Sequence, residues 1–196
     1  GPDNRAQLQG TILLRAPSTS AQPLCATFES SAFLRTAGFH TASFAADASF
    51  RKCLFEDTAS FDSASFPMSV DFEHALFFQP STFVEVTFAW VNFSDAVFFA
   101  YVHFNRSTFE NALFFTTLFK EDHEFSGASF HEAIFKSAFF EEAIFDSRVS
   151  FGSCEFQGEG SFHSAEFHSE ADFAQAHFTN SARFLNCRFN RETSFF

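Results

Sequence analysis

Phenylalanine recurs along the chain at intervals of five or six residues, and this recurrence is the main hydrophobic pattern. Between Phe28 and Phe195 it makes 32 steps, separated by 19 gaps of five residues and 12 of six. An α-helix repeats every 3.6 residues and a strand every two, so neither element alone explains the interval. We therefore expect a short extended segment and a corner in every step, with the chain winding into coils.

A small side chain stands two residues before almost every one of these phenylalanines. It is Ala in 17 steps and Val, Ser, Cys, Thr or Gly in 14 others, and the one exception is His123, which precedes Phe125. Residues two apart in an extended segment point to the same side. Each step, such as 59–61, 64–66 or 70–72, is therefore expected to bury one Phe with one small partner and to expose the positions between them.

The repeating unit Ala-x-Phe-x-x resembles that of the pentapeptide-repeat family, in a phenylalanine-rich variant with five- and six-residue spacing. It appears as AIFKS at 133–137 and AEFHS at 165–169, and the resemblance covers about residues 24–196. It implies an all-β fold, a right-handed quadrilateral (four-sided) parallel β-helix, or solenoid, with Phe and the small residue inside. Four steps would form one coil, so 32 steps predict about eight coils.

The ends of the chain depart from the rhythm in different ways. Residues 1–4, Gly-Pro-Asp-Asn, are expected to be a scar of tag cleavage, residues 5–27 an N-terminal cap or linker, and residues 28–196 the β-helix. A cap over the first coil is favoured, and a linker from an upstream domain is the alternative. Because the rhythm continues to Phe196 and natural arrays need polar capping ends, we expect truncation at the C-terminus.

Composition narrows the function classes. The 24 acidic residues outnumber the 12 Lys and Arg, for a formal net charge of −12, which argues against direct binding of nucleic acid. No stretch of about 18 apolar residues occurs, so no membrane span is expected. The four cysteines form no C-x-x-C pair, and nothing indicates an oxidising compartment, so we expect a cytoplasmic location.

The sequence offers little that could carry chemistry. Cys53, Cys154 and Cys187 occupy the small inward position, where a thiol behaves as a slightly larger Ala. His163, His168 and His177 are close in sequence but are expected to point away from one another around the coil. His123 lies among Glu121, Asp122 and Glu124, yet no nucleophile and orienting group accompany them. We expect no enzyme, no metal and no cofactor, and we interpret His123 as a local bulge.

The outward positions differ from face to face, if every fourth step lies on the same face. The residues before Phe33, Phe55, Phe77, Phe98, Phe119 and Phe140 are apolar, and Phe78 and Phe99 follow two of these steps. A contiguous apolar patch usually marks an interface. The candidate interface residues are Leu54, Leu76, Phe78, Val97, Phe99, Leu118 and Phe139.

A second face shows the contrast with this apolar stripe. On the face of Phe44, Phe66, Phe88, Phe109, Phe130 and Phe151, the corresponding residues are Ser43, Ser65, Thr87, Thr108, Ser129 and Ser150. In this assignment of steps to faces, the six-residue gaps follow the second and fourth faces up to Phe83 and the first and third faces from Phe145. This change predicts a shift in the shape of the rod midway along its length. An alternative interpretation of the stripe is that the N-terminal segment or a flanking domain covers it.

Three functions are consistent with the sequence. The first is a non-enzymatic interaction scaffold, a rigid acidic rod that self-associates or binds a protein partner through the apolar stripe. The second follows from the resemblance, because some pentapeptide-repeat proteins imitate duplex DNA and bind a type II topoisomerase such as DNA gyrase. This DNA-mimicking function is disfavoured because basic residues are interspersed among the acidic ones, namely Arg51, Lys52, Arg106, Lys120 and Lys136. The third is that the chain is the repeat portion of a larger membrane or effector protein.

Overall fold

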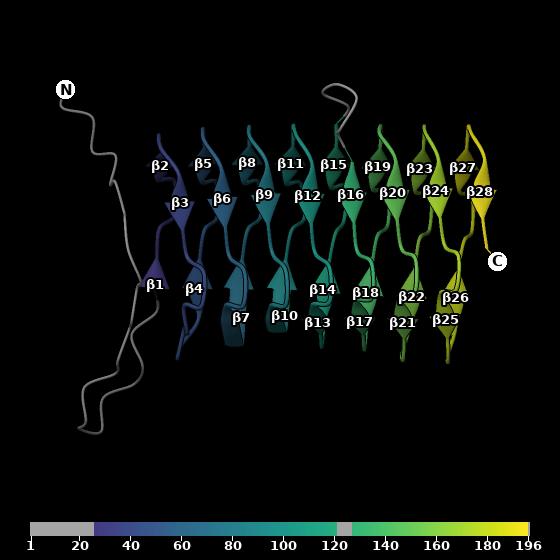
Figure 1. The fold of residues 1–196 in the computed structure, drawn as a ribbon, viewed down its shortest axis with the longest axis horizontal. Coiled ribbons are helices and arrows are strands. Elements are labelled where there is room, and N and C mark those ends of the chain that lie inside the picture. Colours follow the sequence, from purple (N-terminus) through teal and green to yellow (C-terminus); the bar gives the residue numbers. More distant parts are fainter. Residues whose placement is uncertain (1–25, 121–126, 196) are drawn as a thin grey trace.

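The chain folds into a four-sided parallel β-helix, and the part of it that the structure describes contains 28 strands (Figure 1). The computed structural model describes residues 26–120 and 127–195. The expected tag scar, the cap or linker as far as Cys25, and the segment with His123 and Phe125 lie outside the described residues. Successive coils follow one another along the long axis of the molecule, from β1 at one end to β28 at the other. Within the described ranges every strand pairing is parallel, and no helix is present.

We number the four sides in chain order and call each inward phenylalanine a rung; Phe28, Phe33, Phe39 and Phe44 are the first rungs of sides one to four. Side one contains β1 (Ala26–Thr27), β4 (Ala48–Ser49), β14 (Ala112–Leu113), β18 (Ala138–Phe139), β22 (Gly160–Ser161) and β26 (Ala182–Arg183). Side two contains β2 (Ala32–Phe33), β5 (Leu54–Phe55), β8 (Leu76–Phe77), β11 (Val97–Phe98), β15 (Leu118–Phe119), β19 (Ile144–Phe145), β23 (Glu166–Phe167) and β27 (Arg188–Phe189).

The other two sides complete each coil. Side three contains β3 (Ala37–Gly38), β6 (Ala59–Ser60), β9 (Ser81–Thr82), β12 (Val102–His103), β16 (Ala128–Ser129), β20 (Val149–Ser150), β24 (Ala171–Asp172) and β28 (Thr193–Ser194). Side four contains β13 (Thr108–Phe109), β17 (Ile134–Phe135), β21 (Glu155–Phe156) and β25 (His177–Phe178). The longer strands β7 (Ser65–Asp71) and β10 (Thr87–Asn92) turn the corner from side four to side one and join these sides into one 12-stranded sheet.

The core consists of phenylalanine rings stacked along the rod. Rungs on the same side stack with ring centroids between 4.6 Å, as for Phe44 and Phe66, and 5.4 Å, as for Phe66 and Phe88. This distance matches the separation of about 4.7–4.9 Å between neighbouring strands. Across the rod the rings meet edge to face; those of Phe61 and Phe72 lie 5.3 Å apart at 90°. Both arrangements are favourable for aromatic pairs.

The small residue two positions before each rung fills the space that the rings leave. Ala75 and Ala96, for example, are fully buried. At two of these positions a buried hydroxyl donates to the preceding coil: Ser107 Oγ donates to the backbone oxygen of Phe83, and Thr117 Oγ1 donates to that of Phe93. Buried hydroxyls therefore leave no unpaired donor at these two positions.

The corners explain the five- and six-residue gaps. After sides one and three every gap is five residues, and at most of these corners the amide three residues after the rung donates to the rung's carbonyl, as from Ser31 to Phe28, whereas the amide of Val86 donates to Ser107 Oγ. At these corners the residue two positions after the rung has φ between 52° and 59°. This holds at all 15 non-glycine positions of positive φ: Ser30, Thr41, Lys52, Ser63, His74, Glu85, Asp95, Arg106, Thr116, Glu132, Glu142, Ser153, Ser164, Gln175 and Asn186. Such turns normally favour Gly or Asn, so this chain tolerates strain at two corners of every coil.

The step count from sequence is wrong by one. Phe119 stacks on Phe145, and Phe104 stacks on Phe130, so Phe119 on side two and Phe130 on side three are consecutive rungs. Phe125, which the spacing counts as a rung, lies outside the described residues. Without it the ladders form seven complete coils and three sides of an eighth, and the six-residue gaps always follow sides two and four. The predicted change of faces does not occur.

The tight fit between rings and small residues leads to a first prediction. Ala96→Leu adds three carbons at a fully buried position beside the buried rung Phe98, so we expect the free energy of unfolding to fall by about 1–3 kcal/mol. Ala100→Leu is the matched control, because Ala100 is only partly buried outside the ladder and should change stability by less than about 0.5 kcal/mol. Urea denaturation measures both, and equal stability of the two variants would contradict the packing described above.

The strained corners lead to a second prediction. Thr41 is a β-branched residue at φ 57°, so Thr41→Asn should raise the free energy of unfolding by about 0.5–1 kcal/mol, because Asn adopts this conformation more readily. Thr87→Asn is the control at an exposed strand position, where Asn is disfavoured and stability should fall slightly. Thermal denaturation of both variants tests the difference in sign; a loss of stability in Thr41→Asn would refute it.

Candidate protein-interaction surface

An apolar column follows side two along most of the rod. The residues immediately before the rungs lie in register from coil to coil, and five consecutive ones are apolar and partly exposed. They are Leu54, Leu76, Val97, Leu118 and Ile144. The column begins beside Ala32 and ends where Ile144 pairs with Glu166, so polar side chains limit it at the C-terminal end.

A second column lies beside the first, formed by the residues immediately after the rungs. The Phe78 ring is 38% exposed and stacks on Phe99, with centroids 4.6 Å apart and planes at 10°. Lys120, one coil later, places Nζ 6.0 Å from the centre of the Phe99 ring, within reach of a cation–π interaction. The amides of all three donate to side-two carbonyls of the preceding coil, so this column belongs to the same rigid sheet. We call the five residues of the first column, together with Phe78 and Phe99, the side-two stripe.

Phe139 does not belong to this stripe. It pairs with Leu113 on side one, and Ile144 occupies the place on side two that the sequence assigned to Phe139. The misplacement of Phe139 comes from counting Phe125 as a rung, because this count shifts every residue after Phe119 to the side next to its own. The other six predicted residues lie together on side two, and Ile144 is the member that was missed.

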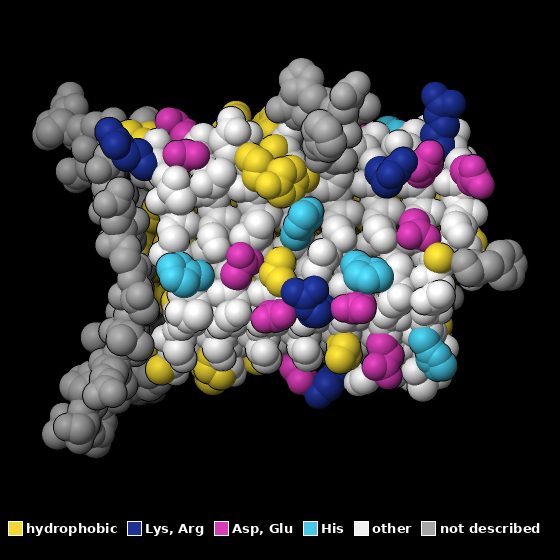
Figure 2. Space-filling view, in the orientation of Figure 1, with side chains coloured by type: hydrophobic (Ala, Val, Ile, Leu, Met, Phe, Trp, Pro, Cys, Tyr) yellow, Lys and Arg dark blue, Asp and Glu magenta, His cyan; other side chains and the backbone are white. Residues whose placement is uncertain are grey.

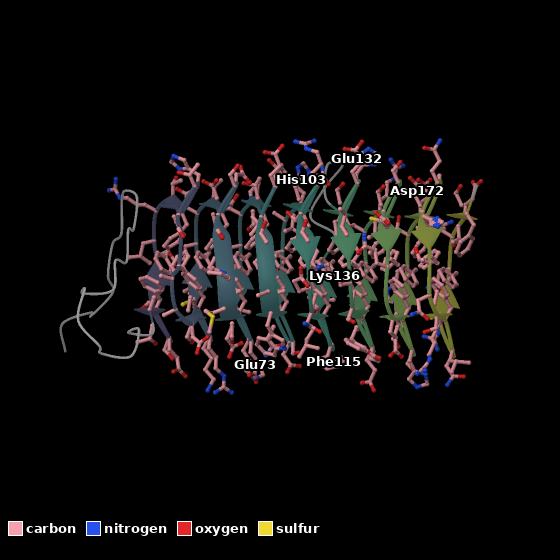
Figure 3. The ribbon with its side chains drawn as sticks, turned by 90° about the horizontal axis from the view of Figure 1, so that it is seen from below. Glu73, His103, Phe115, Glu132, Lys136 and Asp172 are labelled. Carbon is pink, nitrogen blue, oxygen red and sulfur yellow. The ribbon has the colours of Figure 1, made fainter. Side chains whose placement is uncertain are left out.

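The same correction reveals a second apolar group, on side one. Leu113 and Phe139 pair on neighbouring strands, and the Phe115 ring lies 6.2 Å from that of Phe139. Figure 3 shows Phe115 pointing outward from the same flank of the rod as Glu73, with His103, Glu132 and Asp172 on the opposite flank and Lys136 between them. Phe115 and Phe139 could have been recognised in the sequence, because each stands next to a rung and is itself outside the rhythm.

The polar columns lie on the other sides. Ser43, Ser65, Thr87 and Thr108 follow one another on side four as predicted, but the next residue is Ile134, while Ser129 and Ser150 lie on side three. In the view of Figure 2, histidine and acidic side chains are spread over the surface, and hydrophobic side chains gather in one cluster near the middle of its upper edge.

Comparison with known proteins agrees with this architecture. A family profile described as pentapeptide repeats (9 copies) matches residues 61–108 and 151–196. The chain carries pentapeptide repeats. None of the curated proteins compared with it matches.

Two solved structures resemble the pentapeptide-repeat rod. One is QnrB1, a plasmid-mediated fluoroquinolone resistance protein in a trypsin-treated form, with 12% identity, a TM-score of 0.40, and coverage of 87% of this chain and 90% of that one. The other is HetL, a pentapeptide repeat protein involved in regulation of heterocyst differentiation in the cyanobacterium Nostoc sp. strain PCC 7120. It has 11% identity and a TM-score of 0.26, and the match covers 85% of this chain and 86% of that one.

The thiols of the pentapeptide-repeat coils are held as hydrogen-bond donors. Cys53 Sγ lies 2.9 Å from the backbone oxygen of Phe28, and Cys154 Sγ lies 2.8 Å from that of Phe130. Burial raises the pKa of each of these two thiols to about 12. A nucleophilic cysteine needs a thiolate, so neither thiol is suited to covalent catalysis near neutral pH.

The histidines singled out in the sequence do not converge. His163 lies on side one, His168 on side two and His177 on side four, each beside its own rung. A different group could hold a metal ion: Glu73, His74 and Asp95 bring one ligand atom each within 4.8 Å of one another. These carboxylates already have partners, since Arg51 contacts Glu73 at 3.1 Å and Thr116 donates to Asp95 at 2.6 Å.

His168 is held between carboxylates of its own and the preceding coil. Its ring nitrogens lie 2.9 Å from Glu166 and 2.9 Å from Asp146. The hydrogen bond to Glu166, followed by that to Asp146, raises the pKa of His168 despite some desolvation. The hydrogen bond from His168, together with the charge of Arg188, lowers the pKa of Glu166.

This cluster gives the pentapeptide-repeat rod a predictable pH dependence. The raised pKa of His168 stabilises the fold below the ordinary histidine pKa of about 6.5, and this contribution is lost as pH rises through the folded-state value. The lowered pKa of Glu166 stabilises the fold above the ordinary value of about 4.3 and is lost as pH falls through the folded-state value. The cluster should therefore contribute most between these two ordinary values.

The measurement is urea denaturation of the wild type and His168→Gln at several pH values. The variant should lose most stability, relative to wild type, near pH 5 to 6 and least near pH 8.5, because neutral histidine and glutamine differ little in charge. His40→Gln is the matched control on side three. A stability difference for His168→Gln that does not vary with pH would contradict the role of the charged imidazole.

Proposed function

We propose that this chain is a non-enzymatic protein-interaction scaffold, a rigid acidic rod that binds a protein surface through the side-two stripe. The observation that carries the proposal is the stacked and partly exposed Phe78 and Phe99 beside five apolar residues in register. Contiguous exposed apolar surface costs free energy in water and is commonly covered by a partner. Aromatic side chains also dominate the energetics of interfaces.

The rod is suited to this role because its surface is preorganised. Each stripe residue is flanked by a buried rung, and its column is held by strands that pair from coil to coil, as β8 with Leu76 pairs with β5 and with β11. Little conformational entropy is therefore lost when a partner binds. Among the described residues, no helix is long and apolar enough to cross a membrane. We also propose a cytoplasmic location, because Cys53, Cys154 and Cys187 are free thiols.

A DNA-mimicking role at a type II topoisomerase is the alternative, and the charge arrangement favours it less. Among residues 26–120 and 127–195, six acidic side chains form ion pairs with a cation one coil away, which interrupts any continuous acidic column. The pairs are Arg51 with Glu73, Arg106 with Glu85, Lys136 with Glu110, Arg148 with Glu170, Arg183 with Glu159 and Arg188 with Glu166. An imitation of the DNA backbone requires the negative charges to remain unpaired.

Site-specific photo-crosslinking in cells that produce the protein tests the proposal. A photoreactive phenylalanine analogue in place of Leu118 should form adducts with protein, either a second copy or another chain. In a background carrying Phe78→Ser and Phe99→Ser, the adducts should fall by about tenfold, because two aromatic anchors are lost.

Two controls define the outcome. The same analogue in place of Asp62, on side three, should give no adduct above background. Far-UV circular dichroism should show that the double serine variant keeps its β structure, because both rings lie outside the core. Absence of any protein adduct from position 118 would refute the proposal.

A further inference from the structure

The side-two stripe and the charged residues beside it are complementary to the same surface on a second copy of the chain. The first column reads, from coil one to coil six, Ala32, Leu54, Leu76, Val97, Leu118 and Ile144. The second column reads Leu34, Glu56, Phe78, Phe99, Lys120 and Asp146, and from Glu56 onward each amide donates to side two of the preceding coil. Two such faces can pack as stacked sheets, about 10 Å apart.

A two-fold axis parallel to the strands would place the second rod antiparallel to the first. Each column then faces its own copy, and the position of the axis decides which coils meet. With the axis between the third and fourth coils, Phe78 meets Phe99 of the second copy, and Leu76 meets Val97. Leu54 then meets Leu118, and Glu56 meets Lys120, so an acid and a base lie opposite each other twice in one dimer.

Other positions of the axis are less favourable. An axis through the fourth coil brings Glu56 opposite Asp146, which places two like charges together. An axis between the fourth and fifth coils brings Phe78 opposite Asp146 and Leu54 opposite Glu166, which buries carboxylates against apolar groups at a cost in desolvation. The register between the third and fourth coils brings opposite charges together and places no like charges opposite each other, and its one mismatch sets Leu34 opposite Asp146 at the end of the overlap.

We propose that the side-two stripe is the interface of an antiparallel homodimer, with its two-fold axis between the third and fourth coils. This inference rests on the proposed function and names the partner as a second copy of the chain. The interface is isologous, so each contact between different residues occurs twice. Coils seven and eight, with Glu166 and Arg188 on the same side, extend past the second rod and remain in water.

The size of the face sets the expected affinity. Six coils spaced by about 4.8 Å extend about 24 Å along the rod. A face of that length and only a few residues wide lies at the lower end of specific interfaces, so we expect a dissociation constant on the order of micromolar.

Charge exchange tests the register without touching the core. Glu56→Lys places two lysines opposite each other across the interface, and Lys120→Glu places two glutamates there, so each single variant should weaken the dimer by at least about tenfold. The double variant E56K/K120E restores opposite charges and should return to within about threefold of wild type. Sedimentation equilibrium between about 1 and 100 µM measures all four proteins. Thermal denaturation of all four proteins measures how far each substitution changes the monomer itself, because Glu56 has a contact within the chain and Lys120 Nζ lies 6.0 Å from the centre of the Phe99 ring.

The result separates this inference from the function on which it rests. A wild type that is monomeric throughout this range, single variants that dimerise like wild type, or a double variant that fails to recover would each overturn the antiparallel dimer. If the Leu118 analogue then still forms adducts with other proteins, the interaction scaffold stands without self-association. If it forms none, both proposals fail together.

Discussion

The structure depends on one match of lengths: stacked phenylalanine rings and paired β-strands have nearly the same spacing. Rungs such as Phe55 and Phe77 lie 4.6 Å apart in parallel planes, and strands in a sheet lie about 4.7–4.9 Å apart. A ladder of identical rings can therefore run the length of the rod without strain accumulating from coil to coil. A larger ring system would also need a partner for its polar atom, which explains the use of one residue type for nearly the whole core.

The ring ladder is accompanied by turns of fixed length at two of the four corners of each coil and of variable length at the other two. After sides one and three the turn has the same length in every coil and holds residues such as Thr41 and Thr116 at positive φ. After sides two and four the gap varies, and between Phe119 and Phe130 it includes the residues that lie outside the described ranges. The ladder continues across this interval, because Phe119 stacks on Phe145. Insertions are therefore tolerated at corners that the ring ladder does not fix.

Most of the fold could be predicted from the sequence because inward positions are periodic. The four sides, the small partner of each rung and the outward stripe as far as Leu118 follow from counting steps. Counting failed at Phe125, since a phenylalanine at the right interval looks like a rung whether or not it enters the ladder. His123, the one residue that breaks the small-residue rule, stands two positions before Phe125, so the sequence itself indicates that this step differs from the others. The position of Phe139 and the membership of Ile144 depended on that single step.

The separation of inside from outside is what allows a function to be located on such a regular rod. Every coil needs its four rungs, so the rungs cannot distinguish one coil from another, whereas outward positions are free to vary. On side two they change from Ala32 through apolar residues to Glu166 and Arg188 while the rungs stay the same. The stacking of Phe78 on Phe99 repeats the core interaction at the surface, where it adds nothing to the closure of the coil. Phe78 and Phe99 thus stand out in a column whose other members, apart from Leu34, are polar, and this contrast is the physical basis of the proposed interaction surface.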